Sequence, residues 1–254
     1  MKCSLQGFFL KMNKETISKL ISFIDLTSLN SVDNQLNIQQ LVELANLGHF
    51  GNFVSGVCVF ANHGDYARFH LNEHIKTVVV AGNFPHGQAT IEAKIQELKL
   101  ITESSIDEVD LVINRGELIA GNYNYTAKEI EVSKTTIGEK KLKVILETGE
   151  LTKKQIAKAS IIAIENGADF IKTSTGKATF GATEDSAKVI CNEIKKSNLP
   201  IGFKASGGIR SYSDVMLYYN IVKNILGDDF LTPDLFRIGA SSLYKTLINN
   251  YNEI

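Results

Sequence analysis

Residues 141–175 contain one complete copy of the pattern that decides the fold. A short apolar run, KLKVILET (141–148), is followed by an amphipathic stretch, KKQIAKASIIAIENG (153–167), and by a second apolar run, DFIKTST (169–175). Apolar residues at helical spacing that end in a glycine predict a helix, and short β-branched runs predict strands. The stretch therefore predicts a strand, a helix and a strand in one βαβ unit.

The same pattern recurs along the whole chain of 254 residues. Eight strands are expected to begin near Ser22, Val54, Lys76, Glu108, Lys141, Asp169, Pro200 and Leu235. Successive starts lie 22 to 35 residues apart, and a βαβ unit needs about 30 residues. Eight such units predict a (β/α)8 barrel, also called a TIM barrel, as a single domain over residues 1–254 with a short N-terminal helical extension.

An open, doubly wound sheet is the alternative fold. Such a sheet usually carries a Gly-x-Gly-x-x-Gly turn directly after its first strand. After IDLTSLN (24–30), this sequence has no glycine before Gly48. We therefore favour the barrel.

Composition and charge exclude several classes of protein. Lys and Arg number 27 against 28 Asp and Glu, so no net basic field is present to hold nucleic acid or an anionic membrane. The cysteines Cys3, Cys58 and Cys191 are too scattered for a disulfide framework, which suits a reducing compartment. The apolar run from Leu5 to Leu10 is shorter than a signal-peptide core, and no later run is long enough to span a bilayer. We therefore expect a cytoplasmic protein.

Ionisable residues interrupt the strands where a barrel interior should be apolar. They are Asp25, Asp110, Lys143, Glu147, Lys172 and Lys204. One buried charge can be half of a structural ion pair. Several on converging strands indicate function, because an unpaired buried charge costs several kcal/mol and barrel enzymes work at the carboxyl ends of their strands.

Lys172 and Lys204 lie on strands that should be neighbours, so two ammonium groups are expected to share one pocket. Like charge and desolvation both lower a lysine pKa, and we expect Lys204 to supply most of the lowering at Lys172. A neutral lysine amine can attack a carbonyl and form a Schiff base. Position alone does not choose between the two lysines. The hydroxyls of residues 173–175 and Lys177 lead from Lys172 toward the expected phosphate loops, which favours Lys172 as the imine-forming residue.

The loops after the last strands predict a phosphate site. Backbone amides at these loops and at a helix N-terminus form the common phosphate site of this fold. The candidates are Gly207 and Gly208 after strand seven, Gly239, Ser241 and Ser242 after strand eight, and Gly176 and Lys177 after strand six. A Gly-Gly pair alone is usually a tight turn, but its position here favours phosphate binding.

These motifs resemble those of the deoxyribose-phosphate aldolases, a family of class I (Schiff-base) aldolases. The likeness runs along almost the whole chain and is most specific at GADFIKTSTGKATFGAT (167–183), GFKASGGIR (202–210) and FRIGASSL (236–243). It implies reversible cleavage of 2-deoxy-D-ribose 5-phosphate to acetaldehyde and glyceraldehyde 3-phosphate, with neither metal nor other cofactor. The sequence does not reveal the oligomeric state, and a homodimer is our hypothesis.

The resemblance also assigns roles to single residues. Lys172 matches the Schiff-base lysine, Lys204 the lysine that perturbs it, and Asp110 the carboxylate that moves protons with it. Thr27 and Cys58 match positions that line the substrate end of the site. The glycine, serine and Lys177 positions named above match the phosphate-binding loops.

The sequence departs from the family in two places. Relatives often carry Asn-Pro just after the cysteine that Cys58 matches, whereas this chain continues Val-Phe-Ala-Asn-His-Gly-Asp. Some members end in a tyrosine that folds over the site, but Tyr251 is not terminal here, and we do not assign it that role.

Three other functions are alternatives to a class I deoxyribose-phosphate aldolase. A zinc aldolase would need a histidine cluster, and His70 and His74 form no His-Glu-x-x-His pattern and are read as surface residues. A lysine-dependent aldolase acting on a phosphorylated keto substrate is excluded only by the family motifs. A catalytically silent sugar-phosphate binder is disfavoured, because such a protein gains nothing from two buried lysines.

Overall fold

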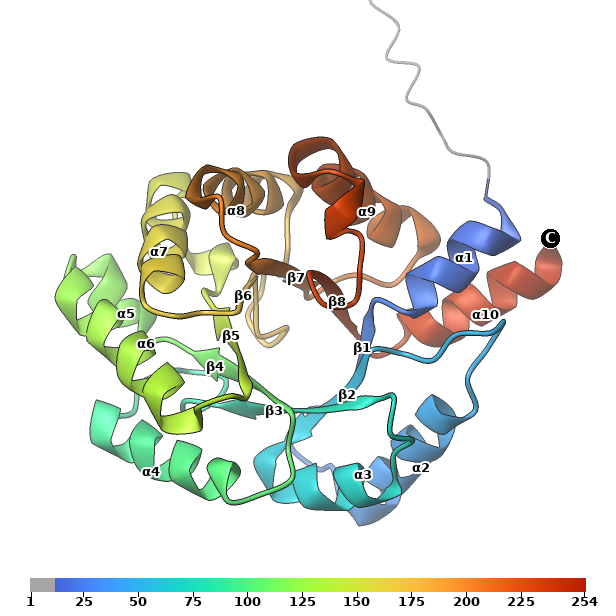
Figure 1. Cartoon of the computed structure of the whole chain (residues 1–254), viewed down its shortest axis with the longest axis horizontal. Coiled ribbons are helices and arrows are strands. Elements are labelled where there is room, and N and C mark those ends of the chain that lie inside the picture. Colours follow the sequence, from blue (N-terminus) through green and yellow to red (C-terminus); the bar gives the residue numbers. More distant parts are fainter. Residues whose placement is uncertain (1–11) are drawn as a thin grey trace, which may run out of the picture.

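Eight parallel strands close into a barrel in the computed structural model, which describes residues 12–254 (Figure 1). The strands are β1 (Ile24–Thr27), β2 (Gly56–Phe60), β3 (Lys76–Ala81), β4 (Glu108–Val112), β5 (Lys141–Ile145), β6 (Phe170–Lys172), β7 (Gly202–Ser206) and β8 (Phe236–Ala240). Each strand pairs with its neighbours in chain order, and β8 returns to pair with β1. The predicted (β/α)8 barrel is confirmed, and the open sheet is excluded.

Helices surround the barrel on its outer face (Figure 1). They are α1 (Lys14–Ile21), α2 (Gln35–Asn46), α3 (Gly64–His70), α4 (Ile91–Thr102), α5 (Arg115–Ile119), α6 (Tyr123–Ile137), α7 (Lys153–Glu165), α8 (Glu184–Ser197), α9 (Tyr212–Leu226) and α10 (Leu243–Glu253). Short 3-10 turns lie at Ala61–His63, Thr148–Glu150 and Asp228–Phe230. Of the helices between residues 12 and 254, none is long and apolar enough to cross a membrane.

Side-chain caps explain where several helices begin. At α9, the Ser211 hydroxyl accepts the Asp214 N–H at 3.1 Å, and the Asp214 carboxylate accepts the Ser211 N–H at 2.9 Å. This reciprocal capping box satisfies two backbone donors that the helix itself leaves unpaired. Thr152 and Gln155 form the same arrangement at α7. The caps therefore fix the residues at which these two helices begin.

The expected N-terminal helical extension is α1. Its buried residues Ile17, Leu20 and Ile21 join the main hydrophobic core, and the helix lies beside α10 (Figure 1). Cys3 and the apolar run from Leu5 to Leu10 lie outside the described residues.

The strands divide their side chains between two environments. Outward residues such as Val144 on β5 and Ile171 on β6 pack with the helices in one continuous apolar core. Inside the barrel, a separate small apolar cluster contains Cys58, Val78 and Val80, next to Leu29. Much of the remaining interior at mid-height is ionic, with the Phe170 ring beside Lys143 and Arg237, in contrast to the branched apolar layers that usually fill this fold.

Candidate active site

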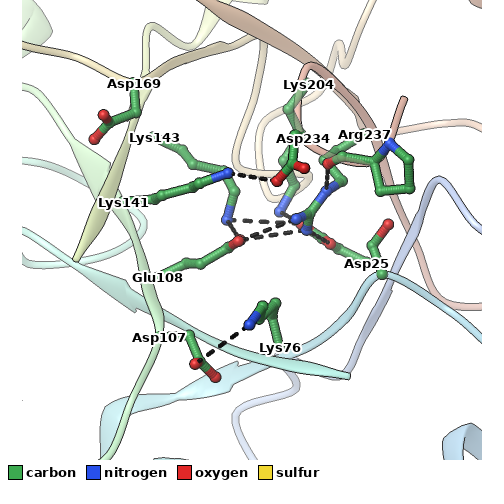
Figure 2. A network of polar contacts seen from close by, with 12 residues as sticks. Asp25, Lys76, Asp107, Glu108, Lys141, Lys143, Asp169, Lys204, Asp234 and Arg237 are labelled. Atoms are coloured by element: carbon green, nitrogen blue, oxygen red, sulfur yellow. Dashed lines mark hydrogen bonds and ion pairs between the residues drawn. The ribbon is translucent and has the colours of Figure 1, made fainter. Parts of the chain in front are cut away.

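Seven charged side chains meet inside the barrel, and each is at most 3% exposed. They are Asp25, Glu108, Asp110, Lys143, Lys172, Lys204 and Arg237. The sequence predicted five of them and missed Glu108 and Arg237. Figure 2 shows Asp25, Glu108, Lys143, Lys204 and Arg237 turned toward one another.

Lys172 and Lys204 lie side by side, as expected from the sequence. They are register partners on β6 and β7, and both donate to the same atom, Asp110 Oδ2, from 2.7 Å. Lys204 also donates to Asp25 Oδ2. One carboxylate oxygen therefore joins the two amines, which is the arrangement that proton exchange between them needs.

The remaining ion pairs lie deeper in the barrel. Arg237 donates through Nη1 to Asp25 Oδ1 at 2.6 Å and through Nη2 to Glu108 Oε1 at 3.0 Å. Lys143 Nζ lies 2.5 Å from Glu108 Oε2 and donates to Asp110 Oδ1 at 3.0 Å. Every carboxylate oxygen of these three acids thus has a cationic partner.

The two lysines have opposite pKa shifts. Burial lowers the pKa of Lys172, and although the Asp110 carboxylate opposes this, the Lys204 ammonium adds to the lowering. Burial also acts against charge at Lys204, but Asp110 and Asp25 outweigh it and raise the pKa of Lys204. Lys204 therefore remains an ammonium group, and Lys172 is the lysine that loses its proton more easily.

The predicted main cause of the lowered Lys172 pKa is wrong. Lys204 was expected to supply most of the lowering of the Lys172 pKa, but burial is the larger cause. The physical reason is that the barrel encloses Lys172 almost completely, so that loss of hydration opposes its charge more strongly than the Lys204 ammonium does. The Asp110 carboxylate, which contacts both ammonium groups, acts in the other direction. That carboxylate stays ionised, because Lys143, Lys172 and Lys204 overcome its burial and hold its pKa well below the usual range.

A cavity of about 280 Å³ opens above Lys172. The residues predicted for phosphate and substrate binding that line it are Thr27, Gly176, Lys177, Gly207, Gly208, Gly239, Ser241 and Ser242. Thr175, one of the hydroxyl residues expected between Lys172 and the phosphate loops, lines it as well, and so do Asn30 and Ser206, which the sequence analysis did not single out. Ser206 could have been found, because it lies two residues after Lys204 and so shares its inward face.

Glycine is required at two points of this wall. Gly207 has a φ of +89°, and a Cβ there would lie 2.9 Å from Gly181 Cα. A Cβ on Gly239 would lie 2.2 Å from Ser206 Oγ and 3.2 Å from Lys204 Cε. The absence of a side chain at Gly207 therefore lets the loop at Gly181 approach closely, and its absence at Gly239 leaves room for Ser206 and Lys204.

The α10 N-terminus forms the other side of the mouth. Ser242 is the N-cap residue of α10, and Ser241 and Ser242 line the same cavity as Lys177 and Gly176. Unpaired amides at a helix N-terminus carry partial positive charge and bind anions. With the Lys177 ammonium, this mouth has the chemistry of a phosphate site.

Cys58 and Tyr251 lie away from the cavity wall. Cys58 is fully buried, with its Sγ 4.0 Å from Asp110 Oδ2, and burial raises the pKa of its thiol. It therefore supports the floor beside Leu29 as a packed apolar group. Tyr251 stacks on Phe50 with 3.3 Å between ring centroids. The chain after Cys58 forms the Ala61–His63 turn and then α3.

Glu147 does not join the charged interior, although it shares sequence parity with Lys143. Strand β5 ends at Ile145, and Glu147 has a φ of 59°, which turns the chain out of the strand. Its carboxylate accepts the Thr175 N–H at 3.3 Å and the Thr175 hydroxyl. Burial raises its pKa. Glu147 thus holds the loop that carries Gly176 and Lys177.

Comparisons with known proteins identify the family of the chain. Residues 19–226 match the family model described as DeoC/LacD family aldolase. The human deoxyribose-phosphate aldolase is 39% identical over 249 residues, covering 90% of this chain and 78% of the human one. A crystal structure of a putative deoxyribose-phosphate aldolase from Coccidioides immitis is 25% identical, with a TM-score of 0.81 over 92% of this chain and 86% of that one.

A third comparison is with the tetrameric deoxyribose phosphate aldolase of Aeropyrum pernix. It is 26% identical, with a TM-score of 0.73 over 94% of this chain and 93% of that one. The fold and these comparisons define a barrel aldolase. The chain belongs to the DeoC/LacD family of aldolases.

Proposed function

We propose that this chain reversibly cleaves 2-deoxy-D-ribose 5-phosphate to acetaldehyde and D-glyceraldehyde 3-phosphate through a Schiff base on Lys172. One observation carries the proposal: the Lys172 amine lies at the floor of a cavity whose mouth is lined by Lys177 and by the loops of Gly207 and Ser242. The name of the human relative supports the substrate. The aldehyde and the phosphate lie at opposite ends of the open-chain substrate. The Lys172 amine and the phosphate-binding mouth likewise lie at opposite ends of the cavity.

The first step is imine formation. The Lys172 amine attacks C1 of the open-chain sugar, and the carbinolamine loses water to leave a protonated imine. The lowered pKa of Lys172 increases the fraction of neutral amine available for attack. Lys204, held as an ammonium by Asp110 and Asp25, is placed to donate the proton that the departing hydroxyl needs.

The second step breaks the bond between C2 and C3. The C3 hydroxyl loses its proton, C3 becomes the aldehyde carbon of glyceraldehyde 3-phosphate, and the bonding electrons move into the imine to form an enamine. Protonation at C2 and addition of water then release acetaldehyde and restore the amine. Asp110, which contacts both lysines, serves as the group through which these protons pass.

The phosphate positions the reacting carbon. Amides of the loops at Gly207 and Ser242 and the Lys177 ammonium hold it at the mouth, which places C1 at the floor. Binding energy from this remote group orients the reacting centre, so it contributes to turnover as well as to affinity.

The proposal is tested by assaying both products from 2-deoxyribose 5-phosphate and from unphosphorylated 2-deoxyribose. We expect acetaldehyde and glyceraldehyde 3-phosphate in equal amounts, and kcat/KM lower by roughly 10²-fold or more for the sugar without phosphate. Failure to form acetaldehyde would refute the activity. Equal kcat/KM for the two sugars would instead refute the phosphate site alone.

Two further expectations belong to this proposal. We propose a homodimer, and light scattering after size-exclusion chromatography would distinguish it from a monomer or from a tetramer like that of the Aeropyrum pernix enzyme. A cytoplasmic location, expected from the cysteine usage, remains a prediction.

A further inference from the structure

Six of the buried charged residues form a closed ring in which the sign of the charge alternates. Around the ring, each cation bridges two carboxylates and each carboxylate bridges two cations, and a longer contact of 3.8 Å between Lys143 Nζ and Asp25 Oδ2 crosses it. In order, the ring is Lys204, Asp25, Arg237, Glu108, Lys143 and Asp110, which returns to Lys204. Its lower part, around Arg237 and Glu108, is shown in Figure 2.

Lys172 is the one lysine of the cluster for which the ring provides no carboxylate of its own. Three carboxylates face three ring cations, so the ring is neutral when all six groups are ionised. Lys172 lies outside the ring and contacts only one of its members, Asp110, through an oxygen that Lys204 already shares. A further charge in a buried and already balanced cluster is costly.

We propose that Glu108 and Arg237 are a positioning pair for the aldolase reaction, closing this ring so that the cluster is neutral when Lys172 is a neutral amine. Neither residue lines the cavity, so the pair acts through its neighbours. Arg237 fixes Asp25, which holds Lys204, and Glu108 fixes Lys143, which holds Asp110. The inference rests on the proposed role of Lys172 as the nucleophile.

The shifts within the cluster agree with this arrangement. Burial opposes charge on Glu108, but Lys143 and Arg237 outweigh it and lower the Glu108 pKa. The Lys172 pKa is lowered although Asp110 opposes the shift. The groups facing Lys172 are Cys58 on β2, Asp110 on β4 and Lys204 on β7. Behind them lie Asp25, Glu108, Lys143 and Arg237.

The experiment changes the charge of the ring one unit at a time and measures the protonation of Lys172 directly. Purified full-length protein is treated with formaldehyde and cyanoborohydride across a pH series, and methylation of Lys172 is followed by peptide mass mapping. The variants are Glu108→Gln, Arg237→Met, Arg237→Lys and the double variant Glu108→Gln/Arg237→Met. Glu129→Gln, which changes a buried carboxylate outside the barrel, is the matched control.

The expected shifts have opposite signs. Glu108→Gln leaves the ring with one extra positive charge, so the Lys172 labelling midpoint should fall, by less than the roughly 1–3 pH units that a charge in direct contact produces. Arg237→Met leaves one extra negative charge and should raise the midpoint by a similar amount. The double variant and Arg237→Lys keep the ring neutral and should return the midpoint to the wild-type value.

The result that overturns the inference is an unchanged midpoint, or shifts of the same sign, in Glu108→Gln and Arg237→Met. If Arg237→Met does not fold, a fall in Glu108→Gln that the double variant reverses supports the inference, and the absence of that fall overturns it. Methylation by formaldehyde requires no sugar phosphate. Failure of the proposed activity, seen as no acetaldehyde, is therefore distinguishable from failure of the charge balance.

Discussion

Two buried lysine–carboxylate pairs in this molecule look alike but lie in different surroundings. Lys94 Nζ donates to Glu129 Oε1 at 2.6 Å between α4 and α6, outside the barrel. Lys172 Nζ donates to Asp110 Oδ2 at 2.7 Å inside it. Each lysine is at most 3% exposed, and burial lowers the pKa of both.

The difference lies in what surrounds each pair. Lys94 also donates to the Val112 carbonyl, and Glu129 also accepts the Asn114 N–H at 2.9 Å, so their polar atoms are held by backbone. The Asp110 carboxylate instead contacts three lysines, and Lys172 lines the cavity. Burial and a shifted pKa are therefore common to a structural pair and a reactive one. A shared carboxylate and access to a cavity distinguish the reactive one.

Substitution of Lys172 should have the largest effect on turnover. Lys172→Met removes the nucleophile, and we expect kcat to fall by at least about 10⁴-fold, since no other group forms the imine. The variant should fold, because a buried cation next to Lys204 is removed. Circular dichroism and product assays check both points. Substantial turnover in a folded Lys172→Met protein would contradict the assignment.

Asp110 should come next. Asp110→Leu removes the carboxylate that joins the two amines, and we expect turnover to fall by roughly 10²-fold or more, the usual scale for a positioned acid or base. Thermal unfolding must be measured alongside, because three lysines lose a partner. Near-normal turnover would remove Asp110 from the mechanism.

A smaller, pH-dependent effect is expected at Lys204. Lys204→Leu removes a positive charge beside Lys172, so the Lys172 pKa should rise and less neutral amine should be present at pH 7. We expect kcat/KM to fall by about 10-fold or more at neutral pH and to recover partly as the pH rises. A deficit of the same size at every pH between about 6 and 10 would show that Lys204 does not act through Lys172.

The outer pair should show the smallest effect on turnover and a large one on stability. Lys94→Met leaves Glu129 buried without its cation, and breaking such a pair costs about 3–5 kcal/mol of unfolding free energy. Turnover per folded molecule should be unchanged. Denaturant titration and active-site-normalised assays measure the two quantities, and a matching loss of turnover would erase the distinction between the pairs.

The sequence was sufficient for the barrel because the apolar runs recur at the spacing of βαβ units. It also identified Lys172, Lys204 and Asp110, because charges inside apolar strands are expensive unless they have a use. In the structure these three residues are in contact, and Lys172 lines one cavity with the loops at Gly207 and Ser242. Their catalytic roles stay predictions until they are measured.

The closure of the ring could not be predicted from local patterns. Glu108 is the first residue of β4, and Arg237 meets it from β8, 129 residues away in the chain. Parity offered a signal, since Glu108 shares an inward face with Asp110. For Glu147 the same signal was misleading. Its parity with Lys143 predicted an inward side chain, but strand β5 ends at Ile145, before Glu147. The dominance of burial at Lys172 depends on how completely the closed barrel encloses its amine, which no local pattern shows.

The central claim is that Lys172 is the reactive amine and Lys204 its charged neighbour. Borohydride reduction in the presence of 2-deoxyribose 5-phosphate, followed by peptide mass mapping, tests it most directly. At neutral pH we predict a reduced two-carbon or sugar-phosphate adduct on Lys172, none on Lys204 or Lys94, and none on any lysine of this cluster in Lys172→Met. An adduct on Lys204 in the unaltered protein would contradict the account.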